Sequence, residues 1–205
     1  EVCKYYSAEG QAAPFERQAL IKLRHIAGDA ALGKKVETHR DSFVYSGAPW
    51  DLTVALDLRR QQVKQLVEPG QINLKHSHGG IVTLEYAIQY LQVMHGHRHP
   101  SLRTPNTLRA LAALIDVGLI PRATGENLRK SYLFIRMLID GLRMVRGNTK
   151  DLVIPPPDSD EFIFLARRVG YQTEDWQAGA RHLQTDIEEH MKQNRQFFEK
   201  MFGKL

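Results

Sequence analysis

The stretch LRKSYLFIRMLIDGLRMVR, residues 128–146, decides the expected fold because its apolar residues recur at intervals of three and four. That spacing places them on one face of an α-helix, whereas a strand would alternate apolar and polar residues. The apolar face comprises Leu128, Tyr132, Ile135, Leu138, Ile139, Leu142 and Val145. We therefore expect a long helix over 123–146 with one buried side.

The same periodicity extends along most of the chain, and turn-forming residues separate the periodic segments. The further expected helices cover 15–27, 30–46, 51–67, 80–94, 105–118, 160–169 and 174–202. Asp29 and Asp51 are expected to cap two of them, and Thr104-Pro105 suits the start of another. Only the opening segment EVCKYY is expected to hold a short strand. The expected fold class is all-α, an antiparallel helical bundle with a four-helix up-and-down core and additional helices.

Composition limits the classes of partner. The chain has 205 residues, 42% of them hydrophobic and 25% charged, which is enough apolar material for a core. The net charge of +5 fits an anionic partner without demanding one. No basic run is interleaved with aromatic residues, so no nucleic acid partner is expected. The single cysteine, Cys3, allows neither an intrachain disulfide nor a cysteine-based zinc site, and favours a cytoplasmic setting.

Targeting signals are not evident in the sequence. No apolar run approaches the roughly 20 residues of a membrane span, and no signal-peptide pattern opens the chain, so no membrane partner is expected. The chain begins with Glu rather than Met, which suggests an excised piece of a longer protein.

The segment KHSHGGIVTLEYAIQYLQ, residues 75–92, carries most of the candidate chemistry. Gly79 and Gly80 begin a helix, where free N–H groups and the positive end of the helix dipole can hold an anion, and Lys75 lies just upstream. The same glycine pair also fits a simple tight turn. Both interpretations remain open from the sequence.

Glu85 borders the apolar stripe of this helix, between Ile81 and Ile88. A carboxylate in that position needs a partner. A structural ion pair with an arginine of a neighbouring helix is the favoured interpretation. The alternative is that Glu85 faces a cleft and contacts a substrate or a metal-bound nucleotide.

Histidines flank the same helix at positions 76, 78, 95, 97 and 99. An H-x-H spacing brings two rings to one face on a strand but not on a helix or loop. We therefore expect solvated loop histidines and helix C-terminal contacts, and no metal site.

Arg129, Arg136 and Arg143 repeat every seven residues on the side of the long helix away from its apolar face. They could form a solvated face with Glu126 and Asp140 as local partners, or a surface for docking an acidic partner. The sequence contains no Ser/His/Asp triad, cysteine nucleophile, P-loop or dinucleotide fingerprint. We therefore expect no catalytic residue in this chain.

Several segments in order resemble the helical part of glutamine synthetase adenylyltransferases, which attach and remove AMP on glutamine synthetase. They are PFERQALIKLRHIAGD (14–29), NLKHSHGGIVTLEYAIQYLQVMHG (73–96), LRTPNTLRALAALIDVGLI (102–120), LRKSYLFIRMLIDGLRMVRGNTKDLVIP (128–155) and FLARRVGY (164–171). The family pattern of a lysine, Gly-Gly, an aliphatic residue, an acidic pair and aromatic-x-x-Gln is matched by Lys75, Gly79, Gly80, Ile81, Glu85, Tyr86 and Gln89.

The resemblance implies a helical bundle that follows a nucleotidyltransferase domain and is related to the bundle of PII uridylyltransferases. The Gly-Ser-x-x-Asp-x-Asp motif of the catalytic domain is missing here, so residues 14–205 would be a non-catalytic helical domain and residues 1–13 a remnant of the upstream domain. ATP and Mg²⁺ would bind the parent protein. Glutamine synthetase, the upstream domain and a PII-like protein are the implied partners.

By resemblance, Lys75, Gly79, Gly80 and Glu85 would line the nucleotide cleft. Glu16 and Arg17 would support the domain junction, and Arg129, Arg136 and Arg143 would be available for a partner. The alternative is a bundle that docks a PII-like protein without touching nucleotide. One departure bears on the cleft: Thr83 stands where the family often has an acidic residue, so Glu85 is the one member of the acidic pair that remains.

Overall fold

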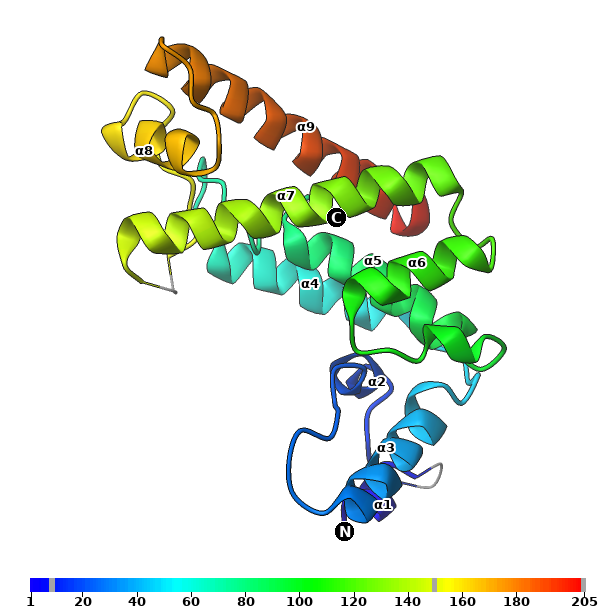
Figure 1. The fold of residues 1–205 in the computed structure, drawn as a ribbon. Helices are drawn as coiled ribbons and strands as arrows, with labels where there is room; N and C mark the ends of the chain where they lie inside the picture. The colour runs from blue at the N-terminus through cyan, green and yellow to red at the C-terminus, as the bar shows by residue number, and fades with distance from the viewer. Residues whose placement is uncertain (8–9, 149–150, 204–205) are drawn as a thin grey trace. The chain divides into compact units, whose positions relative to one another are not determined.

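The computed structural model describes residues 1–7, 10–148 and 151–203, which fold as α-helices joined by turns and loops (Figure 1). The helices are α1 (Val2–Tyr5), α2 (Glu16–Leu20), α3 (Ala30–Val44), α4 (Leu52–Leu66), α5 (Ile81–His95), the 3-10 helix η1 (Pro100–Leu102), α6 (Thr107–Asp116), α7 (Arg122–Arg146), α8 (Asp160–Arg168) and α9 (Trp176–Phe202). Within the described ranges the β pairing is one isolated bridge between Asn73 and Val153. The all-α fold class is confirmed.

The chain forms two compact units, each built from two separate stretches. Unit 1 comprises residues 1–58 and 85–125, and unit 2 comprises residues 59–84 and 126–205. Each unit is described by itself below. The four-helix up-and-down core and the boundary after residue 13 stay predictions.

Unit 1 has an apolar core around the end of α3. Ile21, Val44, Tyr45, Trp50, Ala55 and Val93 form its buried cluster. Trp50 stacks on Tyr90 with a ring separation of 5.4 Å. As expected, the Asp29 side chain caps α3 by accepting from Leu32 N at 2.7 Å, and the Asp51 side chain accepts from Thr53 N at 2.8 Å before α4.

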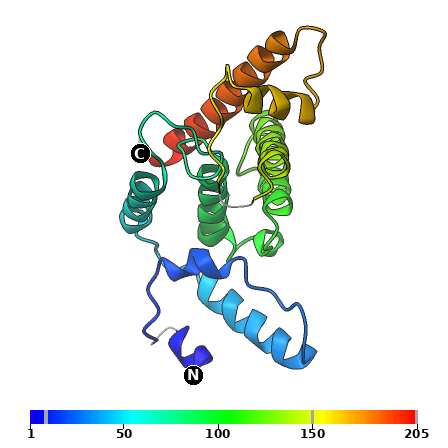
Figure 2. The same cartoon turned by 90° about the vertical axis from the view of Figure 1, so that its left-hand side faces the viewer.

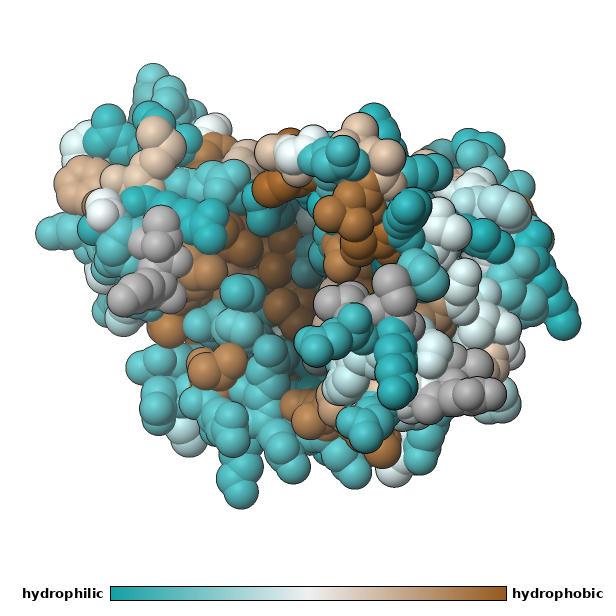
Figure 3. All heavy atoms as spheres, turned by 90° about the horizontal axis from the view of Figure 1, so that it is seen from below, coloured by the Kyte–Doolittle hydropathy of each residue, from teal (hydrophilic) through white to brown (hydrophobic). Residues whose placement is uncertain are grey.

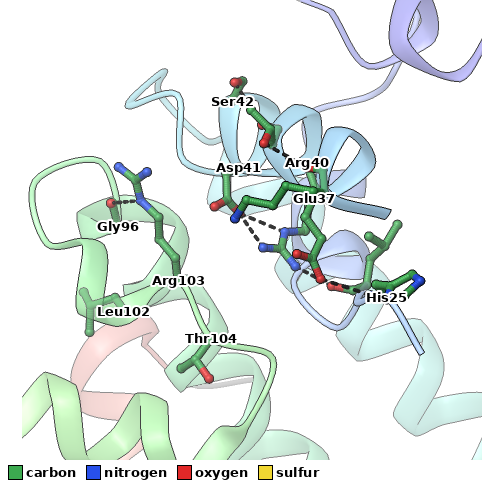
Figure 4. Close-up of polar contacts among 12 residues, drawn as sticks. His25, Glu37, Arg40, Asp41, Ser42, Gly96, Leu102, Arg103 and Thr104 are labelled. Carbon is green, nitrogen blue, oxygen red and sulfur yellow. Dashed lines mark hydrogen bonds and ion pairs between the residues drawn. The ribbon is translucent and has the colours of Figure 1, made fainter. Parts of the chain in front are cut away.

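The helix expected over 15–27 is shorter than predicted, because α2 ends at Leu20. Two backbone groups beyond it bond to side chains of α3: Glu37 accepts from His25 N at 3.0 Å, and the Arg40 guanidinium donates to Leu23 O (Figure 4). An α-helix would need those same backbone groups. Ile26, which would share an apolar face with Leu23 in such a helix, is accordingly 83% exposed.

Two further local predictions were wrong. The opening segment forms the one-turn helix α1 rather than a strand, with Lys4 N and Tyr5 N both donating to Glu1 O. The helix after η1 begins at Thr107 rather than at Pro105. Asn106 is its cap, since the side chain accepts from Arg109 N at 3.0 Å and competes successfully with Thr104 for that role.

Unit 2 is organised around the two long helices α7 and α9 (Figure 2). The apolar faces of both helices are buried. The expected α7 face is confirmed at its centre, where Leu128, Ile135, Leu138, Ile139 and Leu142 are buried. A polar contact joins the two helices: Ser131 Oγ lies 2.9 Å from His190 Nδ1. Helix α8 packs against α9, and Gly141 lets it approach α7, because a Cβ there would lie 2.7 Å from Val169 Cγ1.

Two large apolar side chains at helix ends are exposed. Leu66 at the end of α4 is 49% exposed, and Trp176 at the start of α9 is 56% exposed. Trp176 lies at a helix end, where Arg167 of α8 stands over its ring at 4.9 Å and provides a cation–π contact in place of burial.

No helix in the described part of the chain is both long and apolar enough to cross a membrane. Hydrophilic side chains cover much of the face drawn in Figure 3, with hydrophobic side chains gathered between them.

Candidate functional site

The residues before α5 form a compact turn in unit 2, residues 73–80, that carries Lys75, Gly79 and Gly80. The Asn73 carboxamide oxygen accepts from Lys75 N and His76 N, both at 3.0 Å, and Ser77 Oγ accepts from Asn73 N at 2.8 Å. Such side-chain bonds to a short backbone stretch are typical of Asx-type turns. The turn is therefore a fixed structure, with the Lys75 side chain exposed on it.

Both glycines are required by close backbone packing. Gly79 has φ +89°, and a Cβ there would lie 2.1 Å from Met191 O of α9. The fully buried Asn194 of α9 donates from Nδ2 to Gly79 O at 3.0 Å. A Cβ at Gly80 would lie 2.7 Å from Leu74 O. The glycine pair thus lets the 73–80 turn and α9 come into direct contact.

The backbone N–H groups at this helix start already have acceptors inside unit 2. Gly79 N donates to Thr83 Oγ1 at 3.1 Å, Gly80 N to Ser77 O at 2.8 Å, and Ile81 N to Leu74 O at 2.9 Å. An anion held by the helix start would compete with these bonds. The glycine pair therefore has the geometry of a tight turn. Among the residues of the 73–80 turn, the exposed Lys75 is best able to reach a ligand.

Arg59 of α4 also contacts this turn. Its role was not predicted from the sequence. Its side chain is fully buried, and Nη2 donates to His76 O at 2.8 Å and to Thr83 Oγ1 at 3.1 Å. A signal existed, because position 59 shares a helix face with the apolar residues Ala55 and Val63. An arginine at such a position predicts a buried guanidinium with backbone carbonyl partners.

Thr83 has a structural role in this chain. Its side chain is 1% exposed, and its hydroxyl accepts from Gly79 N and Arg59 and donates to Ser77 O at 3.3 Å. A neutral hydroxyl therefore occupies the place where the resemblance leads one to expect a carboxylate, and it closes the turn instead of facing a ligand.

Glu85 belongs to unit 1, whereas Lys75 and the glycine pair belong to unit 2. Thr107 Oγ1 donates to Glu85 Oε1 at 3.5 Å, and Lys22 Nζ donates to Thr107 Oγ1 at 2.7 Å. Burial lowers the pKa of Lys22, and the negative charge of Glu85 opposes that shift. Glu85 is thus part of a polar cluster that includes Lys22.

Two other residues of the family pattern, Tyr86 and Gln89, line a groove of about 270 Å³ in unit 1. Gln18 and Lys22 face the same groove, whose apolar wall includes Leu58. Gln18 Nε2 donates to Gln89 Oε1 at 2.8 Å, which fixes both amides. Within unit 1, the residues of α5 that match the family pattern therefore gather beside Gln18 and Lys22.

Glu16 and Arg17 lie side by side on α2 and make different contacts. Glu16 accepts from Tyr5 OH at 2.9 Å, Tyr6 OH at 3.2 Å and Ala13 N at 2.9 Å, and the last of these is the main cause of its lowered pKa. Arg17 is buried and donates to Val44 O at 2.9 Å and Ala48 O at 2.8 Å. Glu16 thus contacts residues near the start of the chain, and Arg17 contacts the end of α3; their role at a domain junction stays a prediction.

The arginines of α7 differ in their surroundings. Arg129 and Arg136 are exposed. Arg143 forms the expected local ion pair with Asp140 at 3.3 Å. Docking of an acidic partner on this surface stays a prediction.

The histidines are arranged as local groups rather than as a ligand set. Within the described residues no three His, Cys, Asp or Glu side chains are grouped so that they could hold a metal ion. Burial, followed by the charges of Lys75 and Arg59, lowers the pKa of His76 to about 4. Burial likewise lowers the pKa of His78 and His95. These imidazoles are therefore neutral at pH 7.

Because the pKa of His76 falls from 6.5 when unfolded to about 4 when folded, the unfolded chain binds the proton more tightly. The contribution of neutral His76 to the free energy of unfolding is fully present above pH 6.5 and is lost as the pH falls towards 4. With a discount for its partial exposure, we expect about 1 kcal/mol less unfolding free energy at pH 4.5 than at pH 7. Urea unfolding at both pH values measures this, and His76→Gln should reduce the difference. An unchanged difference in the variant would contradict it.

Comparison with known proteins places these features in a family. A family model described as GlnD PII-uridylyltransferase matches residues 54–202. A bifunctional glutamine synthetase adenylyltransferase/adenylyl-removing enzyme of Mycobacterium bovis is 36% identical over 157 residues, which cover 75% of this chain and 16% of the relative. Enzymes of the same name from Corynebacterium glutamicum and Corynebacterium efficiens are 30% and 31% identical over 84% and 93% of this chain, and over 17% and 18% of their own length. The chain thus spans less than a fifth of these relatives.

Proposed function

The chain belongs to the family described by the GlnD PII-uridylyltransferase model, together with the helical region of bifunctional glutamine synthetase adenylyltransferases, and we propose that it is the regulatory and substrate-docking domain of such an adenylyltransferase. The observation that carries the proposal is the match to these relatives over most of this chain, combined with the lack of a Gly-Ser-x-x-Asp-x-Asp motif in its sequence. In this proposal the domain is not catalytic on its own and works in the cytoplasm beside a nucleotidyltransferase domain.

The parent protein would transfer AMP to glutamine synthetase, or remove it. In the nucleotidyltransferase domain, ATP supplies the AMP group and Mg²⁺ neutralises the charge that develops on the phosphates. Thr83 and Glu85 do not suit a Mg²⁺ site of their own, since Thr83 is buried against Arg59 and leaves Glu85 as a single carboxylate at these two positions. The metal would therefore be held by the neighbouring domain.

The contribution of this chain would be to position the substrates. The exposed Lys75 ammonium can pair with a phosphate, and the fixed 73–80 turn holds the backbone from which it extends. Glu85, held by Thr107, would orient a donor group of a substrate from unit 1. Glu16 and Arg17 would support the junction with the upstream domain, Glu16 through its contacts with Tyr5 and Ala13 and Arg17 through its contact with the end of α3.

In the full-length parent, Lys75→Ala and Glu85→Gln are each expected to lower the rate of AMP incorporation into glutamine synthetase about tenfold to a hundredfold, because each removes a positioning contact. Incorporation of labelled AMP measures the rate. Lys34→Ala and Glu174→Gln, which alter exposed side chains outside the site, serve as matched controls that should keep the parental rate. Parental rates for both site variants would refute the site assignment.

One observation favours a second candidate function. Arg129 and Arg136 are exposed on one face of α7, so this face can dock the acidic surface of a PII-like protein without nucleotide contact. Binding of a PII-like protein that survives both site substitutions would favour this candidate over the first.

A further inference from the structure

A second groove lies wholly within unit 2 and has no part in the proposal above. Its volume is about 740 Å³, in the range of sites that bind small molecules. The second half of α4, the 67–72 loop, residues 77–78 and α9 enclose it. Val63, Val67, Ile72 and Met191 give it an apolar floor. A ligand in this groove would therefore present an apolar surface to that floor.

Positive charge predominates on the rim of the groove. Lys64 extends from α4, and Lys192 and Arg195 extend from one face of α9, three residues apart. None of these three exposed side chains forms an ion pair or hydrogen bond with a described residue. Of the two rim carboxylates, Glu68 and Glu188, the second accepts from Gln184 Nε2 at 3.0 Å.

Two neutral donors complete the wall on the side of the 73–80 turn. Ser77 is buried, and because its Oγ accepts from Asn73 N its hydroxyl hydrogen is available for another acceptor. His78 lies beside it, and burial together with Arg59 and Arg195 lowers its pKa, so that it is a neutral hydrogen-bonding group at pH 7. Three cations, two carboxylates and two neutral donors thus surround one apolar surface.

We propose that this groove binds an organic phosphate of the nucleoside phosphate class. The base would lie on the floor formed by Val63 and Met191, where a methionine sulfur makes favourable contact with an aromatic ring. The phosphate would lie between Lys192 and Arg195, because an arginine fork and a lysine ammonium suit a group carrying more than one negative charge. A monocarboxylate would leave part of this positive charge unmatched.

The position of the groove suggests a regulatory use of the ligand. Ser77 and His78 belong to the 73–80 turn, and Met191 belongs to α9, which are the two segments that the Gly79–Asn194 hydrogen bond joins. A ligand that contacts both segments would stabilise their contact by mass action. The groove would thus sense a nucleotide without taking part in AMP transfer.

Isothermal titration of the 205-residue chain with AMP, adenosine and inorganic phosphate tests the ligand class. AMP is expected to bind at least about tenfold more tightly than adenosine or phosphate, because each of these two lacks one half of the interaction. The affinity for AMP should fall as salt is added. Equal affinities for AMP and adenosine would overturn the proposal. So would a lack of AMP binding, including the case in which an acidic peptide binds and AMP does not.

Matched variants test the location. The double variant Lys192→Glu, Arg195→Glu should lose AMP binding by more than about tenfold. The variant Lys34→Glu, Lys35→Glu has the same charge change on exposed residues of α3 and should bind as the parent does. Equal losses in both variants would overturn the site. The titration measures AMP binding by this chain alone, whereas the incorporation assay measures AMP transfer by the parent, so that failure of this inference and failure of the proposed function give separate results.

Discussion

Gly79→Ala is expected to destabilise unit 2 by about 3 kcal/mol or more, the sum of left-handed backbone strain and a clash with the backbone of α9. The clash follows from the 2.1 Å between the added Cβ and Met191 O, a backbone atom that can move only if α9 moves. Urea unfolding measures the loss. The variant should also weaken the Asn194 hydrogen bond to Gly79 O, so amide exchange near residue 194 should accelerate.

Gly70→Ala is the matched control for this substitution. Gly70 has φ +79°, close to the +89° of Gly79, but a Cβ there would meet no atom within 4 Å. It should therefore cost only the backbone strain of about 1–2 kcal/mol. If both variants lost the same unfolding free energy, the close contact between the 73–80 turn and α9 would contribute nothing to stability.

Arg59→Ala is expected to destabilise the chain by about 3 kcal/mol, because it leaves a cavity and removes the donor to His76 O and Thr83 Oγ1. The loss of unfolding free energy is measured by urea denaturation. The exposed neighbour Arg60 provides the control, and Arg60→Ala should cost less than about 1 kcal/mol. Similar losses for the two arginines would show that the buried guanidinium does not hold the turn.

Periodicity predicted the fold class well because the helices are amphipathic and their apolar faces are buried. The α7 face from Leu128 to Leu142 is the clearest example. Local side-chain chemistry predicted the caps at Asp29 and Asp51 equally well. These features depend on residues close together in sequence, which is why a single sequence suffices for them.

The features that the sequence did not predict depend on contacts between residues far apart in the sequence. The early end of α2 depends on Glu37 and Arg40, and the need for glycine at position 79 depends on Met191, residues that no local pattern links. The sequence therefore indicated the polar character of the 73–80 turn but not the internal hydrogen bonds that occupy its N–H groups. Resemblance pointed to the family, whereas the burial of Arg59 and Thr83 had to come from the structure.

The Gly79–Asn194 contact has a consequence for the order of folding. Its two residues are 115 positions apart, and unit 2 needs both residues 59–84 and the chain after residue 126. Closing so large a loop carries an entropic cost that slows the formation of non-local contacts. On the ribosome, every residue of unit 1 emerges before the last helix of unit 2 does. The segment around the glycine pair must therefore wait for α9 to be made before it acquires its native partner, Asn194.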